Sequence, residues 1–192
     1  GEAQAAFMVK NQSAYAVSSQ DADSLLFGSA KLIRNLSLSG RRKQAGKFSF
    51  KQIAPELIEL EDNLKALGIS REQLIALSIL VGTDFNREGI KGIGPKNALK
   101  LVKKHKDDFD SLFNEVKWSS FYDKNWKDIF SLFIDMPVLT DYSLSWGVPT
   151  NSKIKEMLVD RHNFSEERIN AVLEKIESSK KNNAQKALGE FF

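Results

Sequence analysis

The sequence contains no cysteine and only two histidines, so it can form neither a disulfide nor a thiolate zinc site. It has only four prolines, and no uncharged apolar stretch reaches the roughly 18 residues that span a membrane. The first residues, GEAQAAFMVKN, lack the basic and apolar regions of a secretion signal. We therefore expect a cytoplasmic protein without membrane contact. Any metal ion must be held by oxygen atoms or by the two histidines.

The composition is that of an ordinary globular protein. A length of 192 residues corresponds to one domain or slightly more, and 42% hydrophobic with 28% charged residues excludes a disordered chain. The order of strand and helix patterns predicts an α/β fold. Part of a central sheet flanked by helices is expected in residues 1–69, and a mainly helical portion in residues 70–180. A mobile tail is expected in residues 181–192.

The net charge is only +3, but the charges lie in blocks. Residues 31–51 carry seven Lys or Arg and no acid, residues 87–106 carry seven against the single Glu88, and residues 107–146 carry eight acids against three Lys. Two separated basic blocks favour a polyanionic partner, because neutralising phosphates releases condensed counterions. Such blocks are also typical of a solvated surface, so charge alone does not decide between the two.

Periodicity and turn residues locate the expected elements. Strands are predicted over residues 13–19, 31–38 and 47–53, the last two joined by the basic loop SGRRKQAG. Helices are predicted over 55–66, ending at Gly68; from Ser70, with Gln73 completing a capping box, to Gly82; and from Pro95 onward. Aromatic-rich helices are expected up to about Trp146, and Asn163 with Glu166 is expected to cap a helix that ends near Ser178.

Four carboxylates are candidates for one metal centre. Asp21 and Asp23 lie two residues apart, so an extended backbone would point both to one face. Asp84 follows a buried helix and Glu2 lies in the first turn of another, and each can add oxygen ligands. Mg²⁺ prefers such ligands, and two ions can orient a water and stabilise the leaving oxygen in phosphodiester hydrolysis. A lone D-x-D is also an ordinary turn or a solvated strand end.

The segment GIKGIGPKNALKLVKKH is a candidate phosphate-binding element. Gly92, Ile93 and Gly94 form a tight hairpin, and the helix starting at Pro95 turns its amide groups toward an anion. Lys96 and Lys100, followed by Lys103 or Lys104, form a basic stripe on that helix. This arrangement favours sequence-independent binding of a DNA backbone over a plain helix start, although a glycine-rich turn alone is a weak signal.

Two neighbouring features fit simpler roles. His105 lies on the opposite, apolar side of the helix, so we expect a structural role for it. The basic loop with Arg41 and Arg42 can contact the same duplex, but its Gly and Ser content fits a solvated loop equally well.

The last residues, QKALGEFF, form the third candidate site. Gln185, Leu188, Phe191 and Phe192 recur at helical spacing, so one turn would present an apolar plug beside a polar anchor. The preceding SSKKNNAQ is polar enough to act as a tether. The alternative is a tail that folds back on its own core.

These elements, in this order, resemble the flap endonucleases of the XPG nuclease family, and the tail resembles that of archaeal members. The matching segments cover essentially the whole chain; they are GEAQAA, QDADSLLFG, LVGTDF, GIKGIGPKNALKLVKKH, HNFSEERI and the terminal Q-x-x-L-x-x-F-F box. The resemblance implies a PIN-like nuclease core and two Mg²⁺ ions bound by Glu2, Asp21, Asp23 and Asp84. It implies a helix-two-turn-helix element at residues 82–106 that grips duplex DNA with a monovalent cation at its hairpin. The tail would bind the sliding clamp (PCNA).

The resemblance further implies a 5′ flap endonuclease and 5′-3′ exonuclease acting in replication and repair, with branched DNA as substrate in an archaeal nucleoid. The chain begins inside the family's E-G-E-A motif. We therefore expect it to be the C-terminal part of such an enzyme, inactive alone. The competing hypothesis is a non-catalytic module that binds DNA and the clamp. Family relatives that cut bubbles, junctions or nicked ends share much of the pattern.

Overall fold

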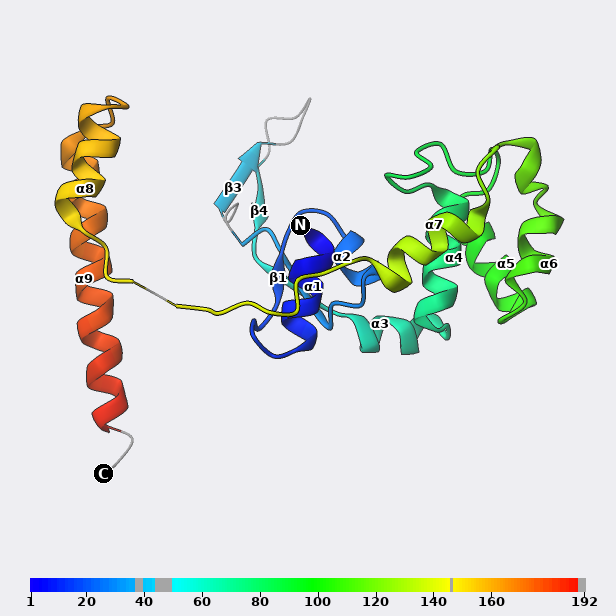
Figure 1. The fold of residues 1–192 in the computed structure, drawn as a ribbon, viewed down its shortest axis with the longest axis horizontal. Coiled ribbons are helices and arrows are strands. Elements are labelled where there is room, and N and C mark those ends of the chain that lie inside the picture. The colour runs from blue at the N-terminus through cyan, green and yellow to red at the C-terminus, as the bar shows by residue number, and fades with distance from the viewer. Residues whose placement is uncertain (37–39, 44–49, 146, 190–192) are drawn as a thin grey trace. The chain divides into compact units, whose positions relative to one another are not determined.

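The computed structural model describes residues 1–36, 40–43, 50–145 and 147–189. It contains two compact units, Gly1–Thr140 and Asp141–Phe192 (Figure 1). The first unit comprises, in chain order, α1 (Glu2–Lys10), β1 (Val17–Ser18), α2 (Asp23–Leu26), β2 (Lys31–Arg34), β3 (Gly40–Lys43), β4 (Phe50–Ile53), β5 (Glu56–Glu59), α3 (Leu60–Leu67), α4 (Arg71–Val81), α5 (Pro95–His105), α6 (Phe109–Glu115), η1 (Trp118–Ser120) and α7 (Trp126–Asp135). The second unit comprises α8 (Asn151–Lys155), the π-helical turn η2 (Glu156–Asp160) and α9 (Glu166–Gly189). The functional division at residues 69 and 180 remains a proposal.

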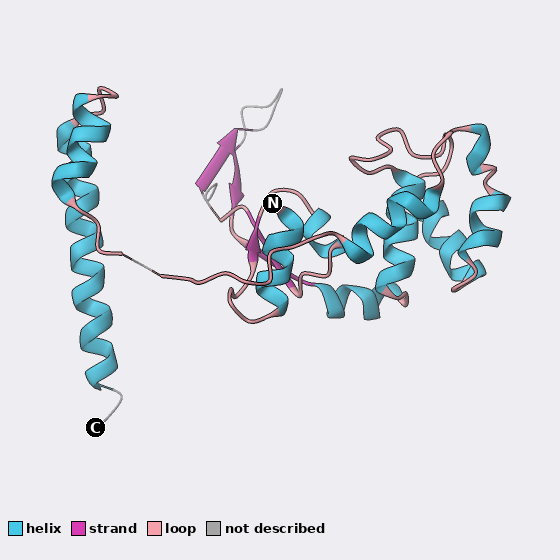
Figure 2. Ribbon diagram, in the orientation of Figure 1, coloured by secondary structure: helices cyan, strands magenta, loops and turns pink. Residues whose placement is uncertain are grey.

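A small mixed sheet with strand order β1-β2-β5 lies beside helices α1 and α2 (Figure 2). β1 runs parallel to β2, with Val17 opposite Leu32, and β5 runs antiparallel to β2, with Ile58 opposite Leu32. Val9 of α1 joins Val17 and Leu32 in a small buried core. The predicted α/β class, with helices flanking part of a sheet, is confirmed.

Two predicted boundaries around this sheet are wrong. The helix expected over residues 55–66 begins only at Leu60, because Leu57 and Ile58 belong to β5 and pair with β2. It ends at Gly68, which adopts φ +64° as a left-handed helix terminus. The strand expected over 31–38 ends at Arg34, because Asn35 turns the chain at φ +59°.

The basic loop expected between two strands is partly a strand itself. The backbone of β3 pairs antiparallel with β4, and Arg41 lies opposite Gln52 in this two-stranded ribbon. Arg41 and Arg42 therefore occupy strand positions and not the predicted loop. Their side chains lie outside the described part of the chain, so their predicted contact with DNA stays untested.

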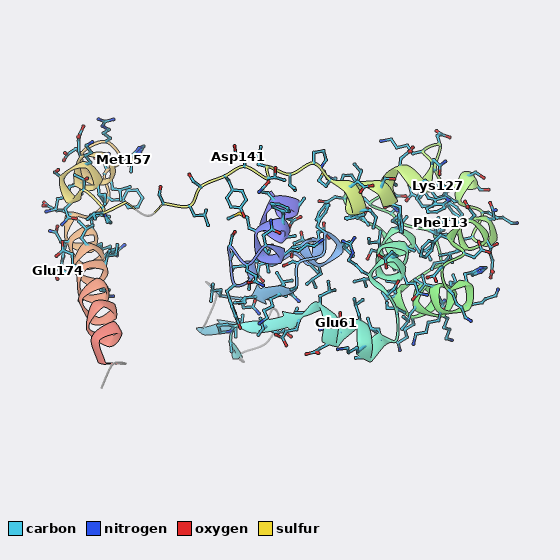
Figure 3. The ribbon with its side chains drawn as sticks, turned by 60° about the horizontal axis from the view of Figure 1, so that its bottom comes forward. Glu61, Phe113, Lys127, Asp141, Met157 and Glu174 are labelled. Atoms are coloured by element: carbon cyan, nitrogen blue, oxygen red, sulfur yellow. The ribbon has the colours of Figure 1, made fainter. Side chains whose placement is uncertain are left out.

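The helices α4 to α7 enclose the larger core of the first unit. Ser70 and Gln73 form the predicted capping box of α4, each side chain accepting the other residue's backbone amide. Ile75 and Ile79 of α4 and Phe113 of α6 are fully buried in this core, and Figure 3 shows Phe113 within the group of helices. Burial of apolar surface thus fixes the helices on either side of the glycine-rich segment 82–94.

The helical region ends earlier than predicted. α7 ends at Asp135 and not near Trp146, because Met136 precedes Pro137 and takes the extended conformation (ψ 127°) that a following proline favours. The chain from Met136 to Ser145 forms no helix, and Trp146 lies outside the described residues.

In the second unit, α9 begins where predicted but is capped differently. The Ser165 hydroxyl accepts the Arg168 amide at 3.4 Å, while Asn163 forms a turn at φ +54°. The helix continues past the expected end at Ser178 to Gly189, since the intervening residues include no glycine or proline. Within the described ranges, no helix has both the length and the apolar character needed to cross a membrane.

Candidate metal centre and nucleic-acid interface

Asp21 and Asp23 lie at the turn between β1 and α2. The Asp21 amide donates to the Ser19 hydroxyl at 3.0 Å, and the Ala22 amide donates to the Asp21 carboxylate at 3.1 Å. These bonds turn the chain, so the prediction that an extended strand orients both carboxylates is wrong. Asp23 instead occupies the first turn of α2, where a negative charge interacts favourably with the helix dipole.

Asp84 is carried by a turn built from buried polar side chains. The Thr83 hydroxyl donates to the Asn86 side-chain oxygen at 2.6 Å, and the Asn86 amide donates to the Ile79 carbonyl at 2.7 Å. Thr83 and Asn86 are both buried, while Asp84 between them is exposed. The turn therefore fixes the backbone of Asp84 against the end of α4. The roles of Thr83 and Asn86 were not predicted from the sequence, where their signal is their position on either side of Asp84.

The structure brings the four predicted carboxylates within electrostatic reach of one another. Partial burial raises the pKa of Glu2, and the charges of Asp23, Asp21 and Asp84 raise it further. Partial burial likewise raises the pKa of Asp23, with Asp21 and Asp84 adding to the effect. Glu2, Asp21, Asp23 and Asp84, from three separate parts of the sequence, thus share one region of negative potential.

The chemistry of this donor set fits a hard divalent cation. All four donors are carboxylates, two of them exposed and two only partly buried, and a cation between them would relieve their repulsion. Among the residues that the structure describes, however, no three or more His, Asp or Glu side chains approach closely enough to hold an ion together. The four side chains are neighbours without forming a closed coordination shell.

The glycine-rich hairpin opens directly onto helix α5. Gly92 has φ +88°, Gly94 caps the helix, and Pro95 stands at its first position, as predicted. A Cβ added at Gly92 or Gly94 would meet no atom within 4 Å, so both backbones face open space. This lets a phosphate approach the main chain closely.

The lysines of the basic stripe on α5 are exposed, and one of them forms an ion pair. Lys96, Lys100 and Lys103 are exposed, and none forms an ion pair with any residue in the described portion. Lys104 instead pairs with Glu115 at 2.6 Å, so its charge is partly compensated. The first three lysines are therefore the freer cations of this stripe.

The opposite side of α5 packs into the protein. Ala98 and Val102 are fully buried, and the Gln73 side chain donates to the Val102 carbonyl at 3.1 Å. His105 hydrogen-bonds to Glu115, and together with Lys104 it anchors α5 to the end of α6. The structural role predicted for His105 is confirmed.

The tail lies largely outside the described part of the structure. Gln185 and Leu188 belong to the backbone of α9, whose side chains beyond Ser178 are not described, and Phe191 and Phe192 lie beyond the described residues. The predicted clamp-binding box therefore remains a prediction.

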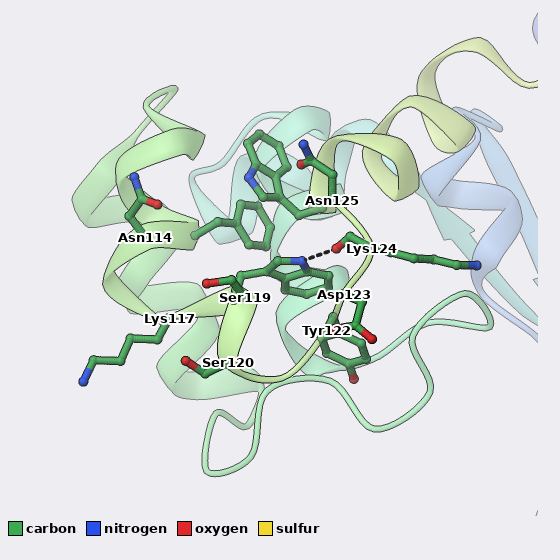
Figure 4. A pocket seen from close by; sticks show the side chains of 11 residues that line it. Asn114, Lys117, Ser119, Ser120, Tyr122, Asp123, Lys124 and Asn125 are labelled. Atoms are coloured by element: carbon green, nitrogen blue, oxygen red, sulfur yellow. Dashed lines mark hydrogen bonds between the residues drawn. The ribbon is translucent and has the colours of Figure 1, made fainter.

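A cavity of about 460 Å³ lies between the end of α6 and the start of α7 (Figure 4). Stacked rings form part of its wall, with centroids 4.3 Å apart for Phe113 and Trp126 and 4.5 Å apart for Trp118 and Tyr122. The dashed line in Figure 4 marks the hydrogen bond that the Trp118 ring N–H donates to the Lys124 carbonyl at 2.7 Å. None of the four candidate metal carboxylates lines it.

Comparison with known proteins connects this geometry to one family. Residues 1–84, which contain all four carboxylates, match the XPG I-region. Flap endonuclease 1 of Hyperthermus butylicus is 51% identical over 179 residues, covering 93% of this chain and 51% of the relative. The chain is therefore similar to XPG-family nucleases. Flap endonuclease 1 of Thermococcus onnurineus is 46% identical over 192 residues and is covered to 54%. The chain thus spans about half the length of the curated XPG-family relatives that it matches.

Solved structures agree with this assignment. Flap endonuclease-1 from Methanococcus jannaschii aligns with a TM-score of 0.76 and 34% identity over 95% of this chain and 52% of that one. The catalytic core of Rad2 in complex with a DNA substrate aligns at a TM-score of 0.64 but only 20% identity, with coverage of 90% and 60%. That second similarity supports the XPG-family fold alone.

Proposed function

We propose that this chain supplies the metal-binding carboxylates and the duplex grip of a structure-specific 5′ flap endonuclease with 5′-3′ exonuclease activity. The observation that carries the proposal is the electrostatic proximity of the four carboxylates, since the charges of Asp21, Asp23 and Asp84 all raise the pKa of Glu2. A protein that only binds DNA gains nothing from carboxylates that repel phosphate unless a cation intervenes. The identity to flap endonuclease 1 relatives supports the same function.

In this proposal, Glu2, Asp21, Asp23 and Asp84 hold two Mg²⁺ ions. When bound, the ions supply a water activated for attack and stabilise the charge on the leaving oxygen of the phosphodiester. The rigid turn through Thr83 and Asn86 keeps Asp84 in position, and the start of α2 does the same for Asp23. The hydrogen bonds of the chain therefore preorganise the acidic region.

The hairpin Gly92–Gly94 and the exposed face of α5 hold one arm of the branched DNA. Backbone amides and the lysines Lys96, Lys100 and Lys103 contact phosphates, with a smaller contribution from the paired Lys104. Such contacts carry no base information, which suits an enzyme that recognises the shape of a junction. A monovalent cation bound at the hairpin carbonyls belongs to the same proposal.

The tail segment from Gln185 to Phe192 is proposed to dock on the sliding clamp. Leu188, Phe191 and Phe192 supply apolar anchors of the kind that dominate small interfaces, and Gln185 supplies a polar one. Tethering would raise the concentration of the nuclease at DNA in an archaeal nucleoid without altering the chemistry.

Cleavage of a labelled 5′ flap, with and without Mg²⁺, tests this function. The assay compares the 192-residue chain with a fusion that adds the unmatched portion of the Hyperthermus butylicus relative. We expect the fusion to cut at the flap junction only with Mg²⁺, and the chain alone to bind duplex DNA without cutting. Binding by both proteins with no cleavage by either would favour the non-catalytic module.

A further inference from the structure

Phe121 is an exposed aromatic residue beside the predicted DNA-binding hairpin. It follows the short helix η1, and 45% of its surface is accessible to solvent. Its ring contacts no other aromatic ring in the described ranges. A single exposed ring is ordinary on a protein surface, so the residues around Phe121 decide what it can contact.

The surrounding contacts hold Phe121 firmly in this exposed place. Trp118 is 5% exposed, and its ring N–H donates to the Lys124 carbonyl. Tyr122 stacks on Trp118 and donates its hydroxyl to the Gly89 carbonyl at 2.8 Å. The segment before and after Phe121 is thus fixed to the protein core and to the loop that leads into the hairpin.

Phe121 and this loop line one open hollow of about 340 Å³. Its lining residues are Arg87, Glu88, Gly89, Lys91, Phe121 and Tyr122. Among these residues the cations Arg87 and Lys91 outnumber the single acid Glu88, and Phe121 adds an apolar ring. Lys91 directly precedes Gly92, which makes the hollow continuous with the hairpin surface.

We propose that Phe121 packs against the deoxyribose edge of the same duplex that the hairpin holds, while Arg87 and Lys91 contact its phosphates. This inference rests on the proposed function, because it extends the duplex grip beyond α5. Charge complementarity and continuity with the hairpin favour DNA over a protein partner. Apolar side chains contact sugars and base edges in the minor groove, where they add affinity without adding charge.

Because the proposed Phe121 contact is uncharged, the salt dependence of binding distinguishes it from a phosphate contact. Loss of a phosphate contact lowers both the affinity and the salt dependence, by about one unit of slope in log Kd against log salt. Loss of an apolar contact lowers affinity and leaves the slope unchanged. Phe121→Ala should therefore weaken duplex binding about tenfold at an unchanged slope.

The experiment measures binding of a 20-base-pair mixed-sequence duplex by fluorescence anisotropy over a salt series. It compares wild type, Phe121→Ala, Lys100→Ala as the phosphate-contact reference, and Leu139→Ala as an exposed apolar control at 71% accessibility. Thermal unfolding checks that each variant folds. If Phe121→Ala is destabilised, Phe121→Leu replaces it in the comparison. This variant keeps apolar contact area and should recover part of the affinity.

The outcomes separate the two claims. Weaker binding of Phe121→Ala at constant slope, with Leu139→Ala unchanged, supports the inference. Wild-type affinity in Phe121→Ala while Lys100→Ala weakens binding overturns the inference and leaves the duplex grip intact. Wild-type affinity in Lys100→Ala contradicts the proposed grip itself. A changed slope in Phe121→Ala would mean that the residue acts through the neighbouring cations, and would overturn the apolar contact.

Discussion

The Thr83 hydroxyl lies 2.6 Å from the side-chain oxygen of Asn86, and this buried hydrogen bond closes the turn that carries Asp84. Asn86 also donates to the carbonyl of Ile79 at the end of α4. One amide group therefore connects a candidate metal ligand to a core helix.

Replacing Asn86 by Ala should destabilise the chain by about 2 to 3 kcal/mol, because it leaves the Thr83 hydroxyl and the Ile79 carbonyl without their buried partner. Urea unfolding measures the loss. Asn97→Ala on the exposed side of α5 is the matched control, with an expected change within about 0.5 kcal/mol. Equal stability of the two variants would show that the Asn86 bonds are not important for folding.

Two glycines of the same loop should respond differently to alanine. A Cβ at Gly89 would lie 2.2 Å from the Val81 carbonyl oxygen, whereas one at Gly92 would meet nothing within 4 Å. Gly92→Ala should cost only about 1 to 2 kcal/mol of left-handed backbone strain, while Gly89→Ala adds a backbone collision and should cost clearly more. Thermal unfolding of both variants checks the order, and the reverse order would contradict the described loop.

The ion pair between α5 and α6 should make stability depend on acid pH. Hydrogen bonds from Lys104 and then His105 lower the pKa of Glu115 below its usual value of 4.5. The unfolded state therefore binds a proton more readily than the native state, so this stabilisation is present above pH ~4.5 and is lost as pH falls through the native pKa. Wild type should lose more stability between pH ~5 and pH ~3 than Glu115→Gln. Parallel acid titrations of the two proteins would contradict the pairing.

The terminal box should act as a portable peptide. Phe191→Ala with Phe192→Ala should remove binding to the sliding clamp, because the two rings supply most of the apolar anchor. Calorimetry with purified clamp measures the effect, and Lys181→Ala in the polar linker is the control. Unchanged clamp affinity in the double variant would exclude the box as the docking site.

Much of the candidate site was predictable because local chemistry encodes it. Pro95 after Gly94 and the spacing of Ser70 and Gln73 specify helix starts whatever surrounds them. Glu56–Glu59 were expected in a helix because Leu57 and Ile58 continue its apolar pattern, and only pairing with β2 makes them a strand. The ion pair of Lys104 with Glu115, 11 residues further along the chain, likewise depends on how α5 packs against α6.

The arrangement of the acidic region likewise depends on contacts that the local sequence does not encode. Sequence identified Glu2, Asp21, Asp23 and Asp84 as oxygen donors, but the reason given for Asp21 and Asp23, an extended strand, is wrong. The proximity of these carboxylates depends on side-chain hydrogen bonds of Ser19 and Asn86, which no residue pattern in the sequence predicts.

Flap cleavage by Asp23→Ala tests the central claim most directly. The variant is made in the fusion that carries the unmatched portion of the relative, beside Asp107→Ala, an exposed acid of the α5-α6 connection, as control. Cleavage with Mg²⁺ and duplex binding are measured on the same samples. We expect Asp23→Ala to abolish cleavage and retain near-normal binding, because the carboxylate serves chemistry and the lysines serve affinity, while Asp107→Ala cuts normally. Near-normal cleavage by Asp23→Ala would contradict the account.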